Sequence, residues 1–253
     1  MKYYQFEKIL KNLEIKPNDT ILIHSDLSKI NIGSSWKDKC LKFYKYLEKY
    51  FMPNGTILIP TFTYSFCKTG KYNKIKSPSE LGIFTEYFRK QKNHLRSDHP
   101  IFSFSIKGKF KNIISNKNSL SATGKGSVFE KLFYLDAKIL FFGISLIKSC
   151  TFLHFIEQSV GVPYRYSKYF KKKNSLKKFE FYARKIRKYK FYTLKENSLI
   201  ERDLLKNNIY TKAKFIKNNI GTCNCKSLYF FVKKKLQKNK YYIIGKKPKL
   251  ILK

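Results

Sequence analysis

Short apolar runs alternate with amphipathic segments along the first part of the chain. Compact apolar runs at residues 20–24, 56–63 and 138–142 predict buried strands, and Pro60 ends the second of them. Residues 3–14 carry apolar side chains at helical spacing, which predicts an amphipathic helix. Further helices are predicted at residues 36–51, 82–89 and 127–135.

The segment after residues 138–142 joins a glycine turn at Gly143 to a helix with three polar side chains. Thr151, His154 and Glu157 fall within about a third of the helix circumference at 100° per residue. A hydroxyl, an imidazole and a carboxylate that face one cleft suit a general base with a companion acid. The competing interpretation is a core histidine that is satisfied by its neighbours, which is the usual role of a single His in an apolar helix.

Two loops separate the predicted elements in the middle of the chain. Residues 64–80 are polar and rich in turn-forming residues. Residues 94–100 form a shaped loop, because Pro100 keeps His99 out of helical geometry. The alternation in residues 101–107 predicts a strand directly after this loop.

The composition changes after residue 163. Residues 164–192 are dominated by Lys, Arg and aromatic side chains, and their partial alternation predicts a β-hairpin or an extended lobe with a basic face. The alternative is a solvated edge without a function. Residues 224–238 predict a helix and residues 241–244 a last strand.

The charge of the chain is extreme, because 54 basic and 16 acidic residues give a formal net charge of +38. A nucleic-acid partner, an anionic membrane or small molecule, and a codon bias toward Lys, Asn, Ile, Phe and Tyr could each explain it. Codon bias should also supply Glu, so part of the positive field is expected to have a use. The chain has no Arg-rich arm, RNP-like aromatic motif or zinc-finger spacing, so specific nucleic-acid recognition is not expected.

The size and the cysteines indicate a cytoplasmic protein. The 253 residues suffice for one large domain or two small ones, no apolar run reaches the 18 or so residues of a membrane span, and the N-terminus lacks the features of a signal peptide. Five cysteines, an odd number, suit reduced thiols. Cys223 and Cys225 lack a second pair of ligands at zinc spacing, and no metal is expected.

Six landmarks follow one another in a recognisable order, at residues 24–28, 55–63, 79–89, 96–103, 126–132 and 143–157. Together they resemble the aminoglycoside 3-N-acetyltransferase family, also called the antibiotic N-acetyltransferase family, and the match is strongest over residues 3–160. The resemblance implies an α/β fold with a mixed central sheet flanked by helices, of the antibiotic N-acetyltransferase type and not the GNAT type. It implies a single acetyltransferase domain over residues 1–253, with residues 164–200 as a basic, aromatic-rich variable insertion. It leaves a homodimer open.

The same resemblance implies acetyl-CoA as donor, a primary amine of an amino sugar as acceptor, and no metal. His154 takes the role of the base. Glu157 is a candidate either for the acid that holds the tautomer of His154 or for binding the substrate ammonium, and Glu201 or Asp203 is the alternative, more distant acid. Thr61 and Thr151 are expected to contact the acceptor. The residues expected to bind acetyl-CoA are Ser25, Leu27, Ser28, Arg96, Ser97, His99, Ser103 and Ser127. Structural alternatives stay open for Arg96, as a buried ion-pair partner, and for His99, as a strut of its loop.

The chain departs from the family pattern at Asp26, Cys150 and in its charge. A field of +38 repels the polycationic aminoglycosides and attracts an anionic acceptor. The expected acceptor is therefore a nucleotide- or lipid-linked amino sugar used in a surface polysaccharide, with peripheral contact to an anionic membrane as a variant. The alternative is an aminoglycoside 3-N-acetyltransferase that confers antibiotic resistance. A second alternative is a non-catalytic basic protein that binds nucleic acid or an anionic membrane.

Overall fold

Helices and strands alternate along the part of the chain that the computed structural model describes, which comprises residues 1–115, 119–185, 189–190, 199–213, 219–245, 247 and 249–250. The strands are β1 (Thr20–Ser25), β2 (Thr56–Pro60), β3 (Leu95–Arg96), β4 (Phe104–Gly108), β5 (Lys138–Phe142), β6 (Arg165–Lys171), β7 (Lys178–Arg184), β8 (Tyr189–Lys190), β9 (Tyr210–Lys212), β10 (Ile220–Asn224) and β11 (Lys249–Leu250). The helices are α1 (Tyr3–Asn12), η1 (Leu27–Lys29), α2 (Trp36–Phe51), α3 (Phe66–Thr69), α4 (Ile83–Arg89), α5 (Lys111–Ser115), α6 (Val128–Tyr134), α7 (Leu146–Ser149), α8 (Phe152–Val160), α10 (Ile200–Lys206), α11 (Cys225–Lys238) and η2 (Tyr242–Ile244).

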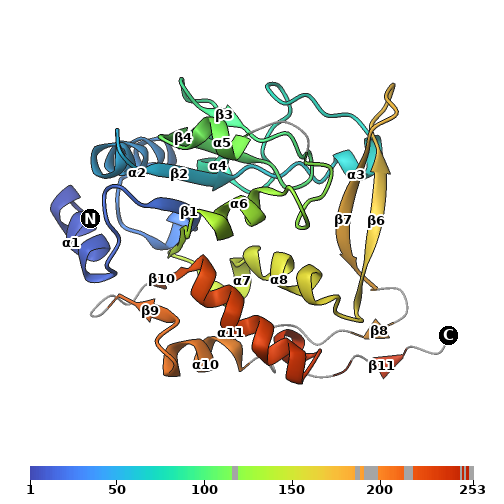
Figure 1. The fold of residues 1–253 in the computed structure, drawn as a ribbon. Coiled ribbons are helices and arrows are strands. Elements are labelled where there is room, and N and C mark those ends of the chain that lie inside the picture. Colours follow the sequence, from blue (N-terminus) through green and yellow to red (C-terminus); the bar gives the residue numbers. More distant parts are fainter. Residues whose placement is uncertain are drawn as a thin grey trace.

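A mixed sheet forms the centre of the molecule, with the strand order β3-β4-β2-β1-β5-β10-β9 (Figure 1). The three middle strands are parallel, and β1 pairs with both β2 and β5. Antiparallel strands flank them, with β4 beside β2 and β10 beside β5. The carboxyl ends of the three parallel strands therefore meet at one edge of the sheet, which is where α/β proteins commonly bind ligands.

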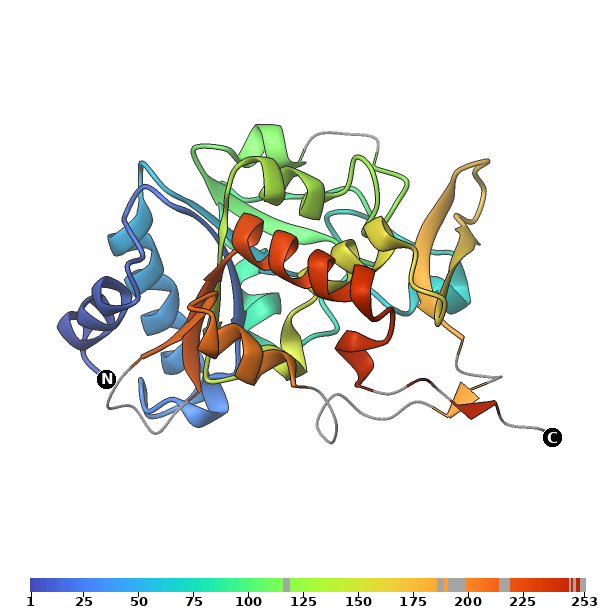
Figure 2. The same ribbon diagram turned by 60° about the horizontal axis from the view of Figure 1, so that its bottom comes forward.

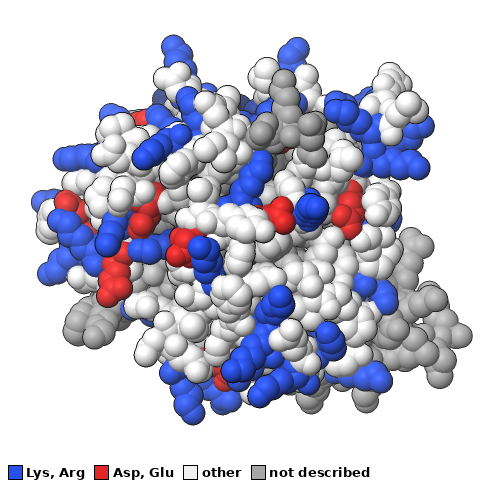
Figure 3. Space-filling view, in the orientation of Figure 1, with Lys and Arg blue, Asp and Glu red and all other residues white. Residues whose placement is uncertain are grey.

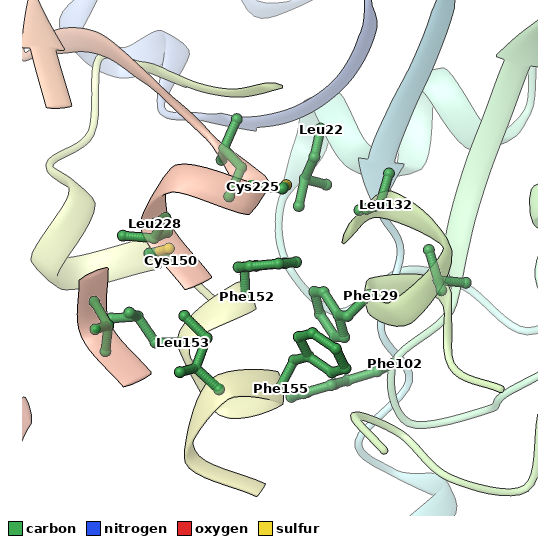
Figure 4. Packing of buried hydrophobic residues seen from close by; sticks show 14 of the residues in the cluster. Leu22, Phe102, Phe129, Leu132, Cys150, Phe152, Leu153, Phe155, Cys225 and Leu228 are labelled. Atoms are coloured by element: carbon green, nitrogen blue, oxygen red, sulfur yellow. The ribbon is translucent and has the colours of Figure 1, made fainter. Parts of the chain in front are cut away.

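Alternate side chains of the parallel strands enter two hydrophobic cores. Ile21 and Ile23 of β1 join the core that α1, α2 and α4 cover, whereas Leu22 joins the core beneath α6, α8 and α11. Because both faces are covered, these strands are continuous apolar runs, as the sequence indicated. Figure 4 shows the second core from close by, with Leu22 near the aromatic rings of Phe129 and Phe152.

Local capping explains where several helices begin and end. The Ser127 hydroxyl accepts a hydrogen bond from the Glu130 amide at the start of α6, and Asn224 accepts one from the Ser227 amide at the start of α11. Such caps each stabilise a protein by about 1 kcal/mol. The helix α8 ends at Gly161, whose φ of 68° is in the left-handed region that glycine tolerates best.

Most predicted elements are confirmed, but the C-terminal part differs. The prediction of a last strand at residues 241–244 is wrong, because Tyr242–Ile244 form the short helix η2 with Ile243 and Ile244 buried. The place beside β10 is instead occupied by β9, and the sequence pattern predicted neither of these two strands. The strand expected at residues 101–107 begins only at Phe104.

The β6–β7 hairpin confirms the prediction for residues 164–192 as far as these residues are described, which excludes residues 186–188 and 191–192. It stands at the opposite end of the molecule from α1 in both views (Figures 1 and 2). Lys and Arg side chains gather near its free end on the face shown in Figure 3. Among the described residues, no helix has the length and apolar character that crossing a membrane requires.

Candidate active site

The Gly143 turn brings α7 and α8 to the carboxyl edge of the parallel strands. Gly143 has a φ of 78°, and a Cβ atom there would lie 2.3 Å from the carbonyl oxygen of Asp26. The amide of Asp26 donates to the carbonyl of Phe142 at 2.9 Å. Only glycine permits this close approach, so the turn after β5 is packed directly against the turn after β1.

His154 and Glu157 form the polar centre of α8. The distance between His154 Nδ1 and Glu157 Oε2 is 2.8 Å, and Tyr164 donates its hydroxyl to Glu157 Oε1 at 2.9 Å. The Glu157 side chain is 1% exposed and that of His154 24% exposed. Their i, i+3 spacing on one helix makes this contact, as the sequence predicted.

Arg165 completes this cluster from the first position of β6. Its Nε lies 2.7 Å from Glu157 Oε2, its Nη2 lies 2.9 Å from His154 Nδ1, and its Nη1 donates to the Tyr182 carbonyl at 2.9 Å. The sequence pattern does not distinguish Arg165 as a site residue, because it is one of many basic residues in its segment. Its burial is the distinguishing property, and burial of a strand end follows from tertiary contacts.

The charges of the cluster keep Glu157 ionised and His154 neutral near pH 7. Burial alone would raise the pKa of Glu157, but Arg165 and His154 hold it below its usual value. Burial lowers the pKa of His154 and the charge of Arg165 lowers it further, which outweighs the opposing effect of Glu157. A neutral imidazole is the form that can accept a proton.

The imidazole ring is also held by packing. Phe102 stacks on it with a centroid distance of 6.1 Å and an interplanar angle of 17°. Within the described residues, His154 Nε2 has no hydrogen-bond partner, whereas Nδ1 faces Glu157 and Arg165. The ring therefore offers Nε2 to a ligand.

Arg96 is placed differently from the expectation that it binds acetyl-CoA. Its side chain is buried, and all five of its N–H donors are directed at protein oxygens: Ser103 Oγ, Thr63 Oγ1 and the carbonyls of Thr61, Lys74 and Ser77. No donor is left for a phosphate. The buried alternative is the better description, although its partners among the described residues are neutral oxygens and not a carboxylate.

Four more of the expected contact residues belong to the same buried framework. Thr61 and Ser103 are 0% exposed and their hydroxyls lie 3.4 Å apart. The Ser97 hydroxyl accepts from the Phe104 amide at 2.9 Å, and the Ser127 hydroxyl is used as the cap of α6. Their positions do not support direct contact with acetyl-CoA or the acceptor, because their polar atoms already face protein groups.

His99 acts as the strut of its loop. The Phe102 amide donates to Nδ1 at 3.2 Å, so the proton lies on Nε2, which donates to the Glu180 carbonyl at 3.0 Å. Burial lowers the pKa of His99 to about 3. The neutral ring thus joins the loop at residues 94–100 to β7.

Buried neutral histidines should make the protein less stable in acid. Between the unfolded pKa of 6.5 and the folded pKa of about 3, the unfolded state binds the proton of His99 and the folded state does not, so stability falls as pH decreases through this window. We expect His99 to account for a loss of about 2 kcal/mol between pH 7 and pH 5. Urea unfolding at both pH values should show a smaller loss in His99→Gln, and an equal loss in both proteins would contradict this assignment.

The turn at residues 25–28 and the start of α8 each contain a hydroxyl that lacks a hydrogen-bond partner among the described residues. Ser25 Oγ and Thr151 Oγ1 are buried and have no hydrogen-bond partner among the described residues. Leaving such groups unpaired costs about 1–3 kcal/mol each, so their presence marks a place where a ligand can supply partners. Leu27 and Ser28 are less open, because the Leu27 carbonyl accepts from Lys39 and the Ser28 hydroxyl donates to Asp26.

The acid beside His154 is Glu157 and not a residue of α10. Glu201 forms an ion pair with Lys212, and Asp203 accepts from the Tyr242 hydroxyl at 3.0 Å. Within the described ranges neither is hydrogen-bonded or ion-paired to His154. The same ranges contain no group of three or more His, Cys, Asp or Glu side chains arranged to hold a metal ion, and all five cysteines are free.

The chain is similar to known acetyltransferases in its sequence and its fold. The model of a family described as aminoglycoside 3-N-acetyltransferase matches residues 22–237. The SPbeta prophage-derived aminoglycoside N(3')-acetyltransferase-like protein YokD of Bacillus subtilis (strain 168) is 27% identical in a match that covers 62% of this chain and 64% of the relative. The match thus spans less than two thirds of that protein.

Two solved structures share the fold. A variant of the aminoglycoside acetyltransferase AAC(3)-IVa in complex with a gentamicin superposes with a TM-score of 0.79 at 20% identity, covering 96% of this chain and 90% of that one. The structure of AAC-IIIb binary with CoASH superposes with a TM-score of 0.73 at 18% identity, covering 94% of this chain and 97% of that one. These likenesses confirm the expected α/β architecture with a mixed sheet flanked by helices.

Proposed function

Because the chain belongs to the aminoglycoside 3-N-acetyltransferase family, we propose that it transfers an acetyl group from acetyl-CoA to a primary amine of an aminoglycoside. The observation that carries the proposal is the His154–Glu157 pair, with Nδ1 held by a buried carboxylate and Nε2 open. This is the arrangement that a general base requires.

The donor is proposed from the family and from the open hydroxyls at the sheet edge. AAC-IIIb is described as binary with CoASH. In this chain the Ser25 hydroxyl would hold acetyl-CoA, and the Thr151 hydroxyl, at the start of α8, would face the acceptor. When bound, acetyl-CoA supplies the acetyl group as an activated thioester.

The protein's part in the transfer is to move a proton. An amine is mostly protonated at neutral pH and becomes a nucleophile only when it loses a proton. His154 Nε2 accepts this proton while Nδ1–H remains bonded to Glu157. The ionised Glu157 then balances the charge of the imidazolium. Phe102 and the buried cluster keep the ring in one orientation throughout.

The acceptor class is proposed from the comparisons and not from the net charge. The AAC(3)-IVa variant is described in complex with a gentamicin, and the family name refers to aminoglycosides. They favour an aminoglycoside over the nucleotide- or lipid-linked amino sugar that the net charge predicted. A cytoplasmic location is part of the proposal, because five free thiols suit a reducing compartment.

An anionic amino sugar is the second candidate acceptor. The net charge of +38 and the two arginines near His154, Arg165 and Arg184, favour it. Thiol release from acetyl-CoA separates the two candidates. We expect faster turnover with gentamicin- or kanamycin-type drugs than with any nucleotide-linked sugar that bears a free amine. The reverse order would contradict the main proposal and support the second candidate.

The acid side of the pH–rate profile should report His154. Because its pKa is lowered from the usual 6.5, the midpoint of the acid limb of kcat/KM that His154 causes is expected below pH 6.5. Below the pKa it should fall about tenfold per pH unit as the base becomes protonated. An acid limb with a midpoint above pH 7 in steady-state assays would contradict a neutral His154 in the free enzyme.

A further inference from the structure

We propose that Arg165 is a positioning residue, which fixes the Glu157 carboxylate and thereby determines which ring nitrogen of His154 accepts the proton. The inference rests on the proposed function for its catalytic meaning, but its geometry is independent of the acceptor. It also assigns a role to the β6–β7 hairpin, whose first residue would complete the active site.

His154 Nδ1 lies beside one hydrogen-bond acceptor and one hydrogen-bond donor, which require different tautomers of the ring. Glu157 Oε2, at 2.8 Å, can only accept a hydrogen bond when ionised, whereas Arg165 Nη2, at 2.9 Å, can only donate one. One ring nitrogen cannot satisfy both at once. If Nδ1 carries the proton, Nε2 is free to act as a base; if Nδ1 is the acceptor, Nε2 carries the proton and cannot.

The remaining contacts of Arg165 decide between these tautomers. Besides the Nη2 contact with His154, Arg165 Nε lies 2.7 Å from Glu157 Oε2 in an ion pair without a directed hydrogen bond, and Nη1 donates to the Tyr182 carbonyl at 2.9 Å. The Nδ1–H group of His154 has Glu157 as its acceptor. With the proton on Nδ1, the ring donates to the ionised carboxylate and Arg165 loses its Nη2 contact but keeps the ion pair with Glu157 and the Tyr182 hydrogen bond. The other tautomer would keep the Nη2 contact but set a ring lone pair against an ionised carboxylate at 2.8 Å, which is the costlier mismatch. The clamped carboxylate selects Nδ1–H and leaves Nε2 as the base.

Arg165 is held firmly enough to serve this purpose. It is 6% exposed, although the next four side chains of β6 are exposed. Two further links tie the hairpin to the body of the protein at Glu180: its side chain accepts from Gln158 Nε2 of α8 at 2.9 Å, and its carbonyl accepts from His99 Nε2 at 3.0 Å. The hairpin that carries Arg165 is therefore anchored both to α8 and to the loop of His99.

The charged and titratable groups around His154 lie on α8, on β6 and β7, and at the residue before β6. Glu157 lies on α8, Arg165 on β6 and Arg184 on β7, and Tyr164 reaches the cluster through its bond to Glu157. The two arginines lower the pKa of His154 and Glu157 raises it, so removal of Arg165 should raise it.

The test is a pair of variants at one position with a matched control. Arg165→Gln removes the cation, and Arg165→Lys keeps a cation that cannot span the carboxylate and the Tyr182 carbonyl. Lys168→Gln removes the same charge from an exposed position of β6. We expect kcat to fall on the order of 10-fold to 100-fold in both Arg165 variants, less than the ~10²–10⁴-fold effect of losing a base. Lys168→Gln should match the unaltered protein.

A second readout does not need turnover. Nitrogen-15 NMR of labelled histidine in the full chain, without substrate, reports the pKa and the tautomer of His154. We expect Nδ1–H and a pKa below 6.5 in the unaltered protein, a higher pKa in Arg165→Gln, and a mixture of tautomers in Arg165→Lys. If Arg165→Gln does not fold, Arg165→Lys alone decides: an unchanged tautomer and unchanged kcat would overturn the inference.

The two readouts separate this inference from the proposed function. The NMR changes without thiol release for any tested amine would support the role of Arg165 and reject the acetyl transfer. Thiol release with the same acid limb in Arg165→Gln as in the unaltered protein would keep the activity and overturn the role of Arg165.

Discussion

Replacement of His154 with alanine is expected to lower kcat for acetyl transfer by about 10²–10⁴-fold. The imidazole is the open base at the site, with Nδ1 bonded to Glu157 and Nε2 without a partner among the described residues. Without it, the amine must lose its proton to water. Thiol release from acetyl-CoA at saturating donor and acceptor measures the effect.

A second histidine provides the control. His94 lies between Tyr44 and Ser105 with ring-nitrogen distances of 3.3 Å to each hydroxyl, and burial lowers its pKa to about 4. His94→Gln should therefore leave kcat within a fewfold of the unaltered protein. Circular dichroism should show intact folding for both variants, and CoA affinity should be retained in His154→Ala. A loss in kcat of less than tenfold in His154→Ala would reject the assignment of the base.

Replacement of Glu157 with alanine is expected to lower the free energy of unfolding by about 3–5 kcal/mol. Glu157 is 1% exposed and pairs with Arg165, which is itself buried. Removing the carboxylate leaves a buried guanidinium without its counter-charge and the Tyr164 hydroxyl without its acceptor. Urea unfolding at pH 7 measures the change in the free energy of unfolding.

A surface carboxylate serves as the comparison. Glu7 pairs with Lys11 at 2.8 Å on α1, with the Lys11 side chain 66% exposed. Exposed pairs of this kind contribute about 0–1 kcal/mol, so Glu7→Ala should have little effect. The double variant Glu157→Gln, Arg165→Met should recover much of the lost stability, because a neutralised buried pair is often tolerated, but not the activity. Comparable stability of Glu157→Ala and Glu7→Ala would show that the buried pair is not formed.

The same pair predicts an acid dependence of stability. The pKa of Glu157 is lowered on folding, so its contribution is complete above the unfolded value of 4.5 and is lost as pH falls through the lower folded value. This loss begins below pH 4.5 and overlaps only the lower part of the window, from pH 6.5 to about 3, in which His99 takes effect. Glu157→Gln should therefore reduce the dependence of the free energy of unfolding on pH, and it should do so more at pH 2–4 than at pH 5–7.

Local patterns correctly predicted the three buried strands at the centre of the sheet and most helices. Strands β1 and β5 are apolar on both faces, and the Ser127 and Ser35 caps mark helix starts through contacts three residues apart. The same kind of pattern failed at residues 241–244, because a short apolar run can be buried as a turn or as a strand. Whether it pairs depends on which segment lies beside the edge of the sheet, and here β9 takes the place beside β10.

Within the site, the sequence by itself determined the contact between His154 and Glu157. Three residues on one helix bring the two side chains to the same face whatever surrounds them. The tertiary structure decided the rest. It brought Arg165 from the hairpin to the carboxylate and stacked Phe102 on the ring. It also placed Arg96, which was expected to bind acetyl-CoA, as a buried donor to protein oxygens. Which way a long polar side chain faces depends on neighbours far along the chain, and no local spacing contains that information.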